Sequence, residues 1–176
     1  SSGSYRISVQ EIAVPEIYRT TDGFEANTTT IGTGTLFMTN GDTTTEVLID
    51  ATSASVEGIA NAINGADGDA TAIIINDAEG QVYLQIATLD YQESNQLTIV
   101  VDDDDDSDSD DAGLSLLATS QLTITTPAGS AQLTVDGNLF ERSSNAITDI
   151  ISDVTLFLLA VSEADTEGEI EITQQS

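Results

Sequence analysis

The chain has 176 residues, of which 31 are acidic and only three, all arginines, are basic, so its formal net charge is −28. Binding to phosphate or to an anionic lipid surface requires clustered cations, so this composition excludes nucleic acid and membrane surfaces as partners. Histidine, cysteine, lysine and tryptophan are all absent, which removes the usual general base, thiol nucleophile, Schiff-base amine and imidazole ligand, and we expect neither an enzyme nor a cofactor.

The first predicted element is a strand from Tyr5 to Ala13, in which apolar and polar residues alternate. Pro15 and the polar stretch 20–30 interrupt the pattern after this strand. No neighbouring strand is therefore available for a hairpin, and we expect the strand to pair with a distant part of the chain.

Four further strands are predicted from apolar runs between turn signals: 34–38, 45–50, 71–76 and 81–88. Asn40-Gly41 marks the turn between the first two. Within the last strand, Tyr83 alternates with Val82 and Leu84, so its side chain is expected on the opposite, exposed face. Aromatic residues are enriched in interfaces, which makes Tyr83 a candidate interface residue.

A helix is predicted between the two strand pairs. Its apolar residues recur at i, i+3, i+4 and i+7: Val56, Ile59, Ala60 and Ile63. The pattern ends at Asn64-Gly65, where we expect a left-handed C-terminal cap.

Ten residues with the sequence DDDDDSDSDD, 102–111, follow a strand predicted over 96–101. Dense carboxylates suggest a divalent-ion site, because Ca²⁺ takes about six to eight oxygen ligands. The weak candidate ligands are Asp102, Asp104, Asp106, Asp108 and Asp110. The loop lacks the glycine and the distal bidentate glutamate of an EF-hand, so we favour a solvated connector and no metal site.

The acidity of the whole chain has two interpretations. Salt screens the repulsion between exposed carboxylates, so a halophilic or marine protein tolerates such a charge. A cation-binding protein would instead use the carboxylates as ligands. The screening argument favours the saline interpretation.

The stretch 132–161 predicts a strand, a turn at Asp136-Gly137, a helix and a second strand. The residues Ser143, Ser144 and Asn145 are suitable N-caps for this helix. Its apolar stripe consists of Ile147, Ile150, Ile151 and Val154. Val154–Val161 is apolar on both faces, which predicts a buried strand. Arg142 is a second candidate interface residue, with Glu141 or Asp136 as alternative local partners.

Three passages, in a fixed order, carry the motifs of one known family. The passages are SYRISVQEIA at 4–13, IANAIN at 59–64 and VDGNLFERSSNAITDIISDVTLFL at 135–158. They resemble the "Y.I.V..LA" strand, the "IN" motif and the "VDG…R.SN.I.D.I.GVTL.L" passage of the flagellar filament capping protein family, also called hook-associated protein 2 or FliD. Asp153 stands where this family has glycine. The chain is identified as a member, a fragment covering the outer domains without the long helical terminal regions that build the inner ring.

The expected fold class is mainly β, with two antiparallel β-rich domains that each contain about one short helix. Residues 1–28 together with 121–176 are expected to form a discontinuous middle domain. Residues 29–120 would form an outer domain inserted into it. The alternative boundary assigns the hairpin that begins at Gly34 to the first domain. This layout agrees with what the resemblance implies for the family.

The resemblance implies a structural and assembly role, without enzymatic chemistry. The implied partners are flagellin, further copies of the chain in a cap ring, and glycans of host or other surfaces through adhesion. The implied location is extracellular, at the tip of the bacterial flagellum. The alternative is a secreted, calcium-dependent adhesive β domain.

Overall fold

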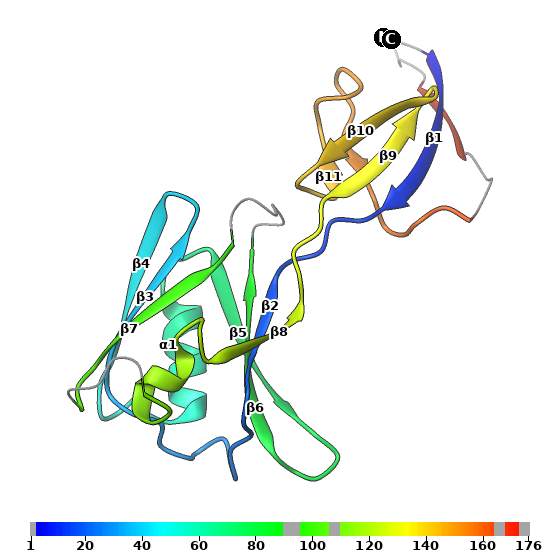
Figure 1. Ribbon diagram of the computed structural model, residues 1–176. Helices are drawn as coiled ribbons and strands as arrows, with labels where there is room; N and C mark the ends of the chain where they lie inside the picture. Colours follow the sequence, from blue (N-terminus) through cyan, green and yellow to red (C-terminus); the bar gives the residue numbers. More distant parts are fainter. Residues whose placement is uncertain (1–2, 90–95, 106–109, 164–167, 173–176) are drawn as a thin grey trace. The chain divides into compact units, whose positions relative to one another are not determined.

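The computed structural model describes residues 3–89, 96–105, 110–163 and 168–172, which form two compact units with separate cores (Figure 1). The terminal unit contains the described residues up to Val14 and from Ala128 onward, and the central unit contains those from Pro15 to Pro127. Each connection between the units therefore has a proline at the junction, where the missing N–H limits strand pairing. The domain boundaries predicted at 28/29 and 120/121 stay a prediction.

The terminal unit is built on one antiparallel sheet with the strand order β10-β9-β1-β13. Its strands are β1 (Gly3–Glu11), β9 (Ala131–Val135), β10 (Asn138–Arg142) and β13 (Gly168–Ile172). The first strand pairs with β9, more than a hundred residues away, and with β13. The expectation of a distant partner for this strand is confirmed.

Strands β9 and β10 form the hairpin predicted at Asp136-Gly137. Both turn residues have a positive φ, 50° and 79° respectively, as a two-residue turn that follows the strand twist requires. Asp136 also ties the turn to β1, because its Oδ1 accepts a hydrogen bond of 3.0 Å from the backbone N–H of Arg6.

The prediction of a helix from Ile147 to Val154 is wrong. The segment instead contains the short strand β11 (Ala146–Ile147), paired with β12 (Leu156–Phe157), and a bend between them. The expected cap residue Asn145 binds elsewhere: its amide accepts from the N–H of Ala13 (2.7 Å) and donates to the carbonyl of Ala13 (2.8 Å). These contacts hold the start of the segment extended. Ile147 and Ile151 still enter the core.

The fully buried strand predicted over Val154–Val161 is also wrong. Leu156 and Leu158 are buried, but the residues between and after them point outward, with exposed fractions of 69% for Phe157 and 89% for Leu159. The segment thus follows the period of two of a strand with one solvated face. The physical reason is that this unit has a core on one side of the segment only.

The central unit contains two antiparallel sheets, ordered β5-β6-β2-β8 and β4-β3-β7. The first comprises β2 (Ile17–Thr20), β5 (Ala70–Asn76), β6 (Val82–Thr88) and β8 (Leu122–Thr126). The second comprises β3 (Gly34–Asn40), β4 (Thr43–Ile49) and β7 (Thr98–Asp103). Mainly antiparallel β structure is therefore confirmed as the fold class.

Helix α1 (Val56–Gly65) follows the predicted apolar stripe, and Ser55 caps it by accepting a hydrogen bond of 3.1 Å from the N–H of Gly58. The predicted left-handed C-cap is wrong, because Ala66 ends the helix in an extended conformation (φ −81°, ψ 141°). Asn64 explains the difference: its side chain accepts from the N–H of Ala72 (2.8 Å) and donates to the carbonyl of the same residue (2.7 Å). This amide joins the helix end to β5.

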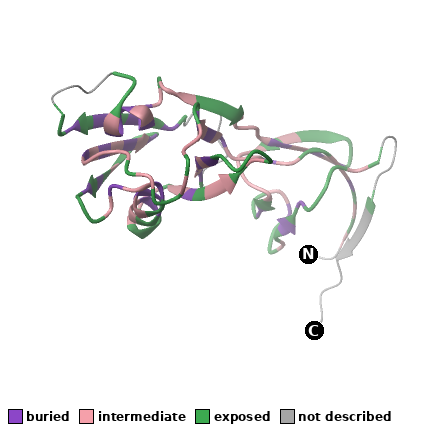
Figure 2. Cartoon of the chain, turned by 90° about the horizontal axis from the view of Figure 1, so that it is seen from below, coloured by how far each residue is buried: buried purple, intermediate pink, exposed green. Residues whose placement is uncertain are grey.

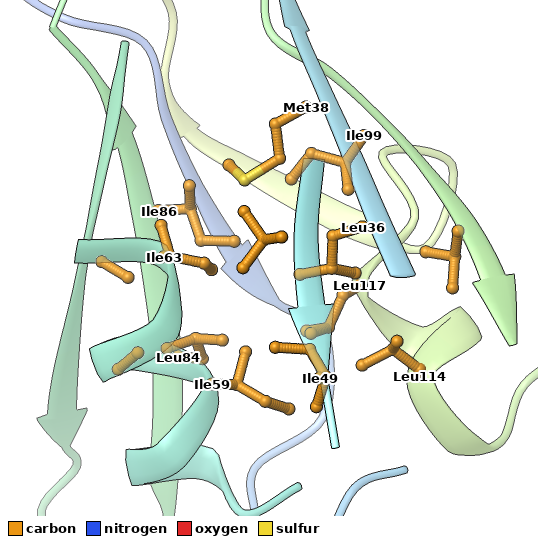
Figure 3. Close-up of a cluster of buried hydrophobic side chains, with 14 of the residues drawn as sticks. Leu36, Met38, Ile49, Ile59, Ile63, Leu84, Ile86, Ile99, Leu114 and Leu117 are labelled. Carbon is orange, nitrogen blue, oxygen red and sulfur yellow. The ribbon is translucent and has the colours of Figure 1, made fainter. Parts of the chain in front are cut away.

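The core of the central unit lies between the two sheets, α1 and the short 3₁₀ helix η1 (Gly113–Leu117). Figure 3 shows the side chains that meet there, among them Leu36, Ile49, Ile59, Ile63, Leu84, Ile86, Leu114 and Leu117. Buried positions, purple in Figure 2, recur along the strands of both units. In the described part of the chain, no helix is long and apolar enough to cross a membrane.

Candidate interaction surfaces

The described part of the acidic stretch is partly structural. Asp103, at the end of β7, is buried, and its Oδ2 accepts a hydrogen bond of 2.9 Å from the N–H of Ser115 in η1. Gly113 makes this approach possible: it has a φ of 59°, and a Cβ there would lie 2.5 Å from Oδ2 of Asp103. Sequence reasoning missed this role, because nothing in a run of five aspartates distinguishes the one that faces inward.

Among the candidate ligands, Asp102, Asp104 and Asp110 belong to the described residues and are exposed. The carboxylate of Asp110 accepts from the N–H of Ala112 (3.1 Å), a local turn contact. No group of three acidic side chains within the described ranges is arranged to hold a metal ion. Asp106 and Asp108 lie outside the described residues, so divalent binding by the loop stays a prediction.

Tyr83 is half-buried on β6 and is engaged by two neighbours. The guanidinium of Arg19, on β2, lies 4.5 Å from the centre of the tyrosine ring. The hydroxyl group of Tyr83 donates a hydrogen bond of 3.4 Å to Oδ2 of Asp77. Arg19 and Tyr83 thus form a cation–π contact on the surface of the sheet.

Arg142 lies at the end of β10 and pairs with Asp149. Its Nε lies 3.0 and 2.9 Å from the two carboxylate oxygens, and its second terminal nitrogen lies 2.8 Å from Oδ2. The hydrogen bonds and charge of Arg142 lower the pKa of Asp149 below its ordinary value. The local partner is therefore Asp149 rather than the side chain of Glu141 or Asp136. Sequence reasoning missed Asp149 because it predicted a helix where the chain forms a short strand and a bend.

A buried carboxylate, missed from the sequence, lies beside β2. Glu16 is only 2% exposed, and its Oε2 accepts a hydrogen bond of 3.1 Å from the N–H of Leu97. The hydroxyl of Tyr18 donates to the carbonyl of the same leucine (3.1 Å). Burial, together with the hydrogen bond and charge of Glu16, raises the pKa of Tyr18. These contacts fix the chain where it enters β7.

A cavity of about 360 Å³ opens on the central unit between the residues after β2 and those around η1. Its lining consists of Thr20, Thr21, Asp22, Phe24, Asp111, Leu116 and Gln121. The hydroxyl of Thr21 is committed to the carbonyl of Gln121 at 2.6 Å, and the amide of Gln121 donates to Asp111 at 3.0 Å. This lining offers no nucleophile with an adjacent base.

Comparisons with known proteins agree with this architecture. The flagellar hook-associated protein 2 of Aeromonas caviae is 30% identical over 176 residues, which cover 97% of this chain and 36% of that protein. The D2-D3 domains of the Escherichia coli flagellar cap protein FliD are 31% identical, with a TM-score of 0.78 and coverage of 99% of this chain and 89% of that structure. The D2-D3 domains of the Serratia marcescens protein, 24% identical, superpose with a TM-score of 0.84 over 98% of this chain and 94% of that structure.

No family model matches the chain. The chain spans about a third of the length of the curated relatives, 36% and 32% of the proteins from A. caviae and E. coli K12. Its similarity to the D2-D3 domains, in contrast, extends over nearly the whole of both chains. The chain therefore belongs to the flagellar hook-associated protein 2 (FliD cap protein) family.

Proposed function

We propose that the chain forms the outer domains of a flagellar filament cap, which promotes flagellin polymerisation at the extracellular tip of the filament. The observation that carries this proposal is the 31% identity to the D2-D3 domains of a cap protein, over 99% of this chain. The proposed partners are flagellin and further copies of the same protein in a cap ring. Because the chain is about a third of its curated relatives in length, the activity of the whole protein is part of the proposal.

The side chains support a role through contacts rather than through covalent chemistry. Two carboxylates that are buried, Glu16 and Asp103, accept hydrogen bonds from backbone N–H groups and stabilise loops. The ion pair between Arg142 and Asp149 is local. Surfaces carried on two rigid β units suit the guiding of another protein chain.

A domain exchange tests the proposal. The corresponding segment of E. coli hook-associated protein 2 is replaced by this chain in a strain that lacks its own copy. We expect filaments to grow and less flagellin to be lost to the medium, as measured by electron microscopy and by flagellin in the culture supernatant. The matched control carries Leu133→Asp, which places an unpaired charge in a fully buried position and unfolds the terminal unit.

An exported, folded chimera that loses as much flagellin as the strain without a cap would contradict the proposal. Adhesion to host or surface glycans stays a prediction of the family resemblance. A calcium-dependent adhesive domain is the alternative function, and calcium dependence separates it from the cap proposal, since a cap that acts through protein contacts does not require the ion.

A further inference from the structure

The outward face of the β5-β6-β2-β8 sheet differs from the rest of this acidic chain. Paired residues of neighbouring strands share a face, and the register aligns Arg19 with Gln85 and Thr123, and Ile75 with Tyr83. We call this surface the neutral face. It consists of Ile17, Arg19, Thr71, Ile73, Ile75, Tyr83, Gln85, Ala87, Thr123 and Thr126.

None of these ten side chains is acidic, although the chain contains 31 acidic residues, and the carboxylate of Asp77 meets the face at the hydroxyl of Tyr83. The outward face of the other sheet of the same unit provides the contrast. There Glu46 pairs with Phe37, and Asp102 pairs with Thr35, so carboxylates flank the central strand on both sides. Of these two outward faces, the neutral face therefore repels a negatively charged molecule less.

The apolar content of the neutral face resembles the centre of a protein interface. Ile73 is 51% exposed, and Ile17, Ile75 and Tyr83 beside it are partly exposed. Interface centres are depleted in charged residues and enriched in aromatic residues and arginine. The neutral face has that composition.

Arg19 is the single charge on the neutral face, and it has no acceptor. Its Nε is buried without a hydrogen-bond partner, and no carboxylate among the described residues pairs with its guanidinium. The ring of Tyr83 orients the group at 4.5 Å. A guanidinium that is held in place, with a buried Nε and no carboxylate partner among the described residues, is prepared for a carboxylate from outside the unit.

We propose that the neutral face is a contact surface for a second copy of this chain, with the guanidinium of Arg19 donating hydrogen bonds to a carboxylate of that copy as its ion-pair partner. This inference rests on the proposed function, in which copies lie side by side in a cap. A copy with a charge of −28 offers many carboxylates, yet it is repelled by every acidic surface of its neighbour. A surface with no acidic residue of its own, and with one arginine that has no carboxylate partner among the described residues, meets both conditions.

The contact joins two different surfaces. None of the residues that define the neutral face is acidic, so the carboxylate that reaches Arg19 comes from another part of the second copy. A contact between unlike surfaces is head-to-tail, and repetition of such a contact closes a ring when the rotation allows. This geometry fits a cap that contains several copies.

Sedimentation equilibrium of the chain tests the inference, from micromolar to millimolar protein. At the ionic strength of physiological buffer we expect a monomer of 18.4 kDa. The Debye length is then about 8 Å, so the carboxylates of two copies in contact still repel one another. In about 1 M NaCl, where this length is about 3 Å, we expect weak concentration-dependent association.

Two matched pairs of variants locate the contact. Ile73→Ser is compared with Leu48→Ser, which is 71% exposed on the outward face of the other sheet. Arg19→Gln is compared with Thr98→Glu, which changes the net charge by the same amount on that other sheet. We expect Ile73→Ser and Arg19→Gln each to weaken association about five- to tenfold, and their controls to change it less than twofold. Circular dichroism verifies that all four variants are folded.

A monomer at every concentration in high salt would overturn the inference, as would equal effects of a variant and its control. If the chain stays monomeric while Arg19→Gln abolishes cap function in the chimera, the neutral face binds a different protein, and the second-copy proposal is wrong. If the chimera fails while association depends on Arg19, the proposed function fails and the self-contact stands.

Discussion

The two units differ in the size of their cores. The described core of the central unit contains twenty buried apolar residues from two sheets and two helical segments, whereas that of the terminal unit contains nine. Side chains bind distant backbone groups in both units: Asn145 binds Ala13 in the terminal unit, and Glu16 binds Leu97 in the central unit. Beside the smaller core, each polar contact of the terminal unit is a larger share of its stability.

The largest expected effect comes from one change made in each core. Leu84 and Leu133 are both fully buried, so replacing either with alanine should lower the free energy of unfolding by about 3 kcal/mol. The terminal unit has the smaller margin, so Leu133→Ala should leave it largely unfolded, while the central unit tolerates Leu84→Ala. Amide hydrogen exchange, resolved by residue, measures both units. Full protection of β9 and β1 in Leu133→Ala would show that the terminal unit is as stable as the central one.

Salt and calcium should affect the two units differently only if the acidic loop binds ions specifically. Raising NaCl should raise the melting temperature of both units gradually, because it screens a charge of −28. We expect CaCl₂ at fixed ionic strength to add nothing, since the loop lacks the glycine and glutamate of a tight site.

The control for this experiment replaces Asp104, Asp106 and Asp108 with asparagine. A saturable stabilisation of the central unit by calcium, lost in this triple variant while the NaCl response remains, would support the adhesive alternative. A gradual salt response with no calcium transition would support the saline interpretation of the acidity.

A smaller effect is expected at Asp153, which has a φ of 64° in the bend of the terminal unit. Glycine adopts this left-handed conformation without strain, so Asp153→Gly should stabilise the unit by about 0.5–1 kcal/mol. In a helix the same change would destabilise by about 1 kcal/mol or less, because glycine is a poor helix former. Denaturant unfolding measures whether Asp153→Gly raises or lowers the free energy of unfolding. A lowered free energy of unfolding would support the helix that the apolar spacing predicts.

That bend shows where the sequence stops predicting the fold. Val56 to Ile63 and Ile147 to Val154 have apolar residues at the same spacing, yet the first is helix α1 and the second is a strand and a bend. The helical segment has a serine cap and alanines, whereas most residues of 147–154 are β-branched and therefore poorer helix formers. The deciding contact, Asn145 with Ala13, joins residues far apart in sequence, and local periodicity carries no information about it.

Local signals were sufficient where the backbone itself constrains the residue type. The turn at Asp136-Gly137 was predictable because both positions require a positive φ. The surfaces were less predictable: Tyr83 was identified as outward-facing, but the alignment of Arg19 above it depends on the order of strands in the sheet. The neutral face is assembled from strands distant in sequence, so no single segment reveals it.

The smallest expected effect compares one exposed aspartate from each unit. The pKa of Asp149 is lowered mainly by hydrogen bonds from Arg142, and that of Asp50 mainly by hydrogen bonds from Thr52, at 2.6 Å from its hydroxyl and 2.8 Å from its N–H. A carboxyl with a lowered folded-state pKa stabilises the fold above its unfolded value of about 3.9, and this contribution is lost as the pH falls through the folded value. Both contributions should therefore disappear only below about pH 4.

Carbon-detected NMR titration of the two carboxyl groups tests this assignment directly. Arg142→Gln should raise the pKa of Asp149 toward its ordinary value and leave that of Asp50 unchanged. Thr52→Ala should do the reverse, since each carboxylate depends on a partner within its own unit. If Arg142→Gln left the pKa of Asp149 low, the ion pair would not be the cause of the shift. The terminal unit would then lack this ion pair as a contribution to its stability.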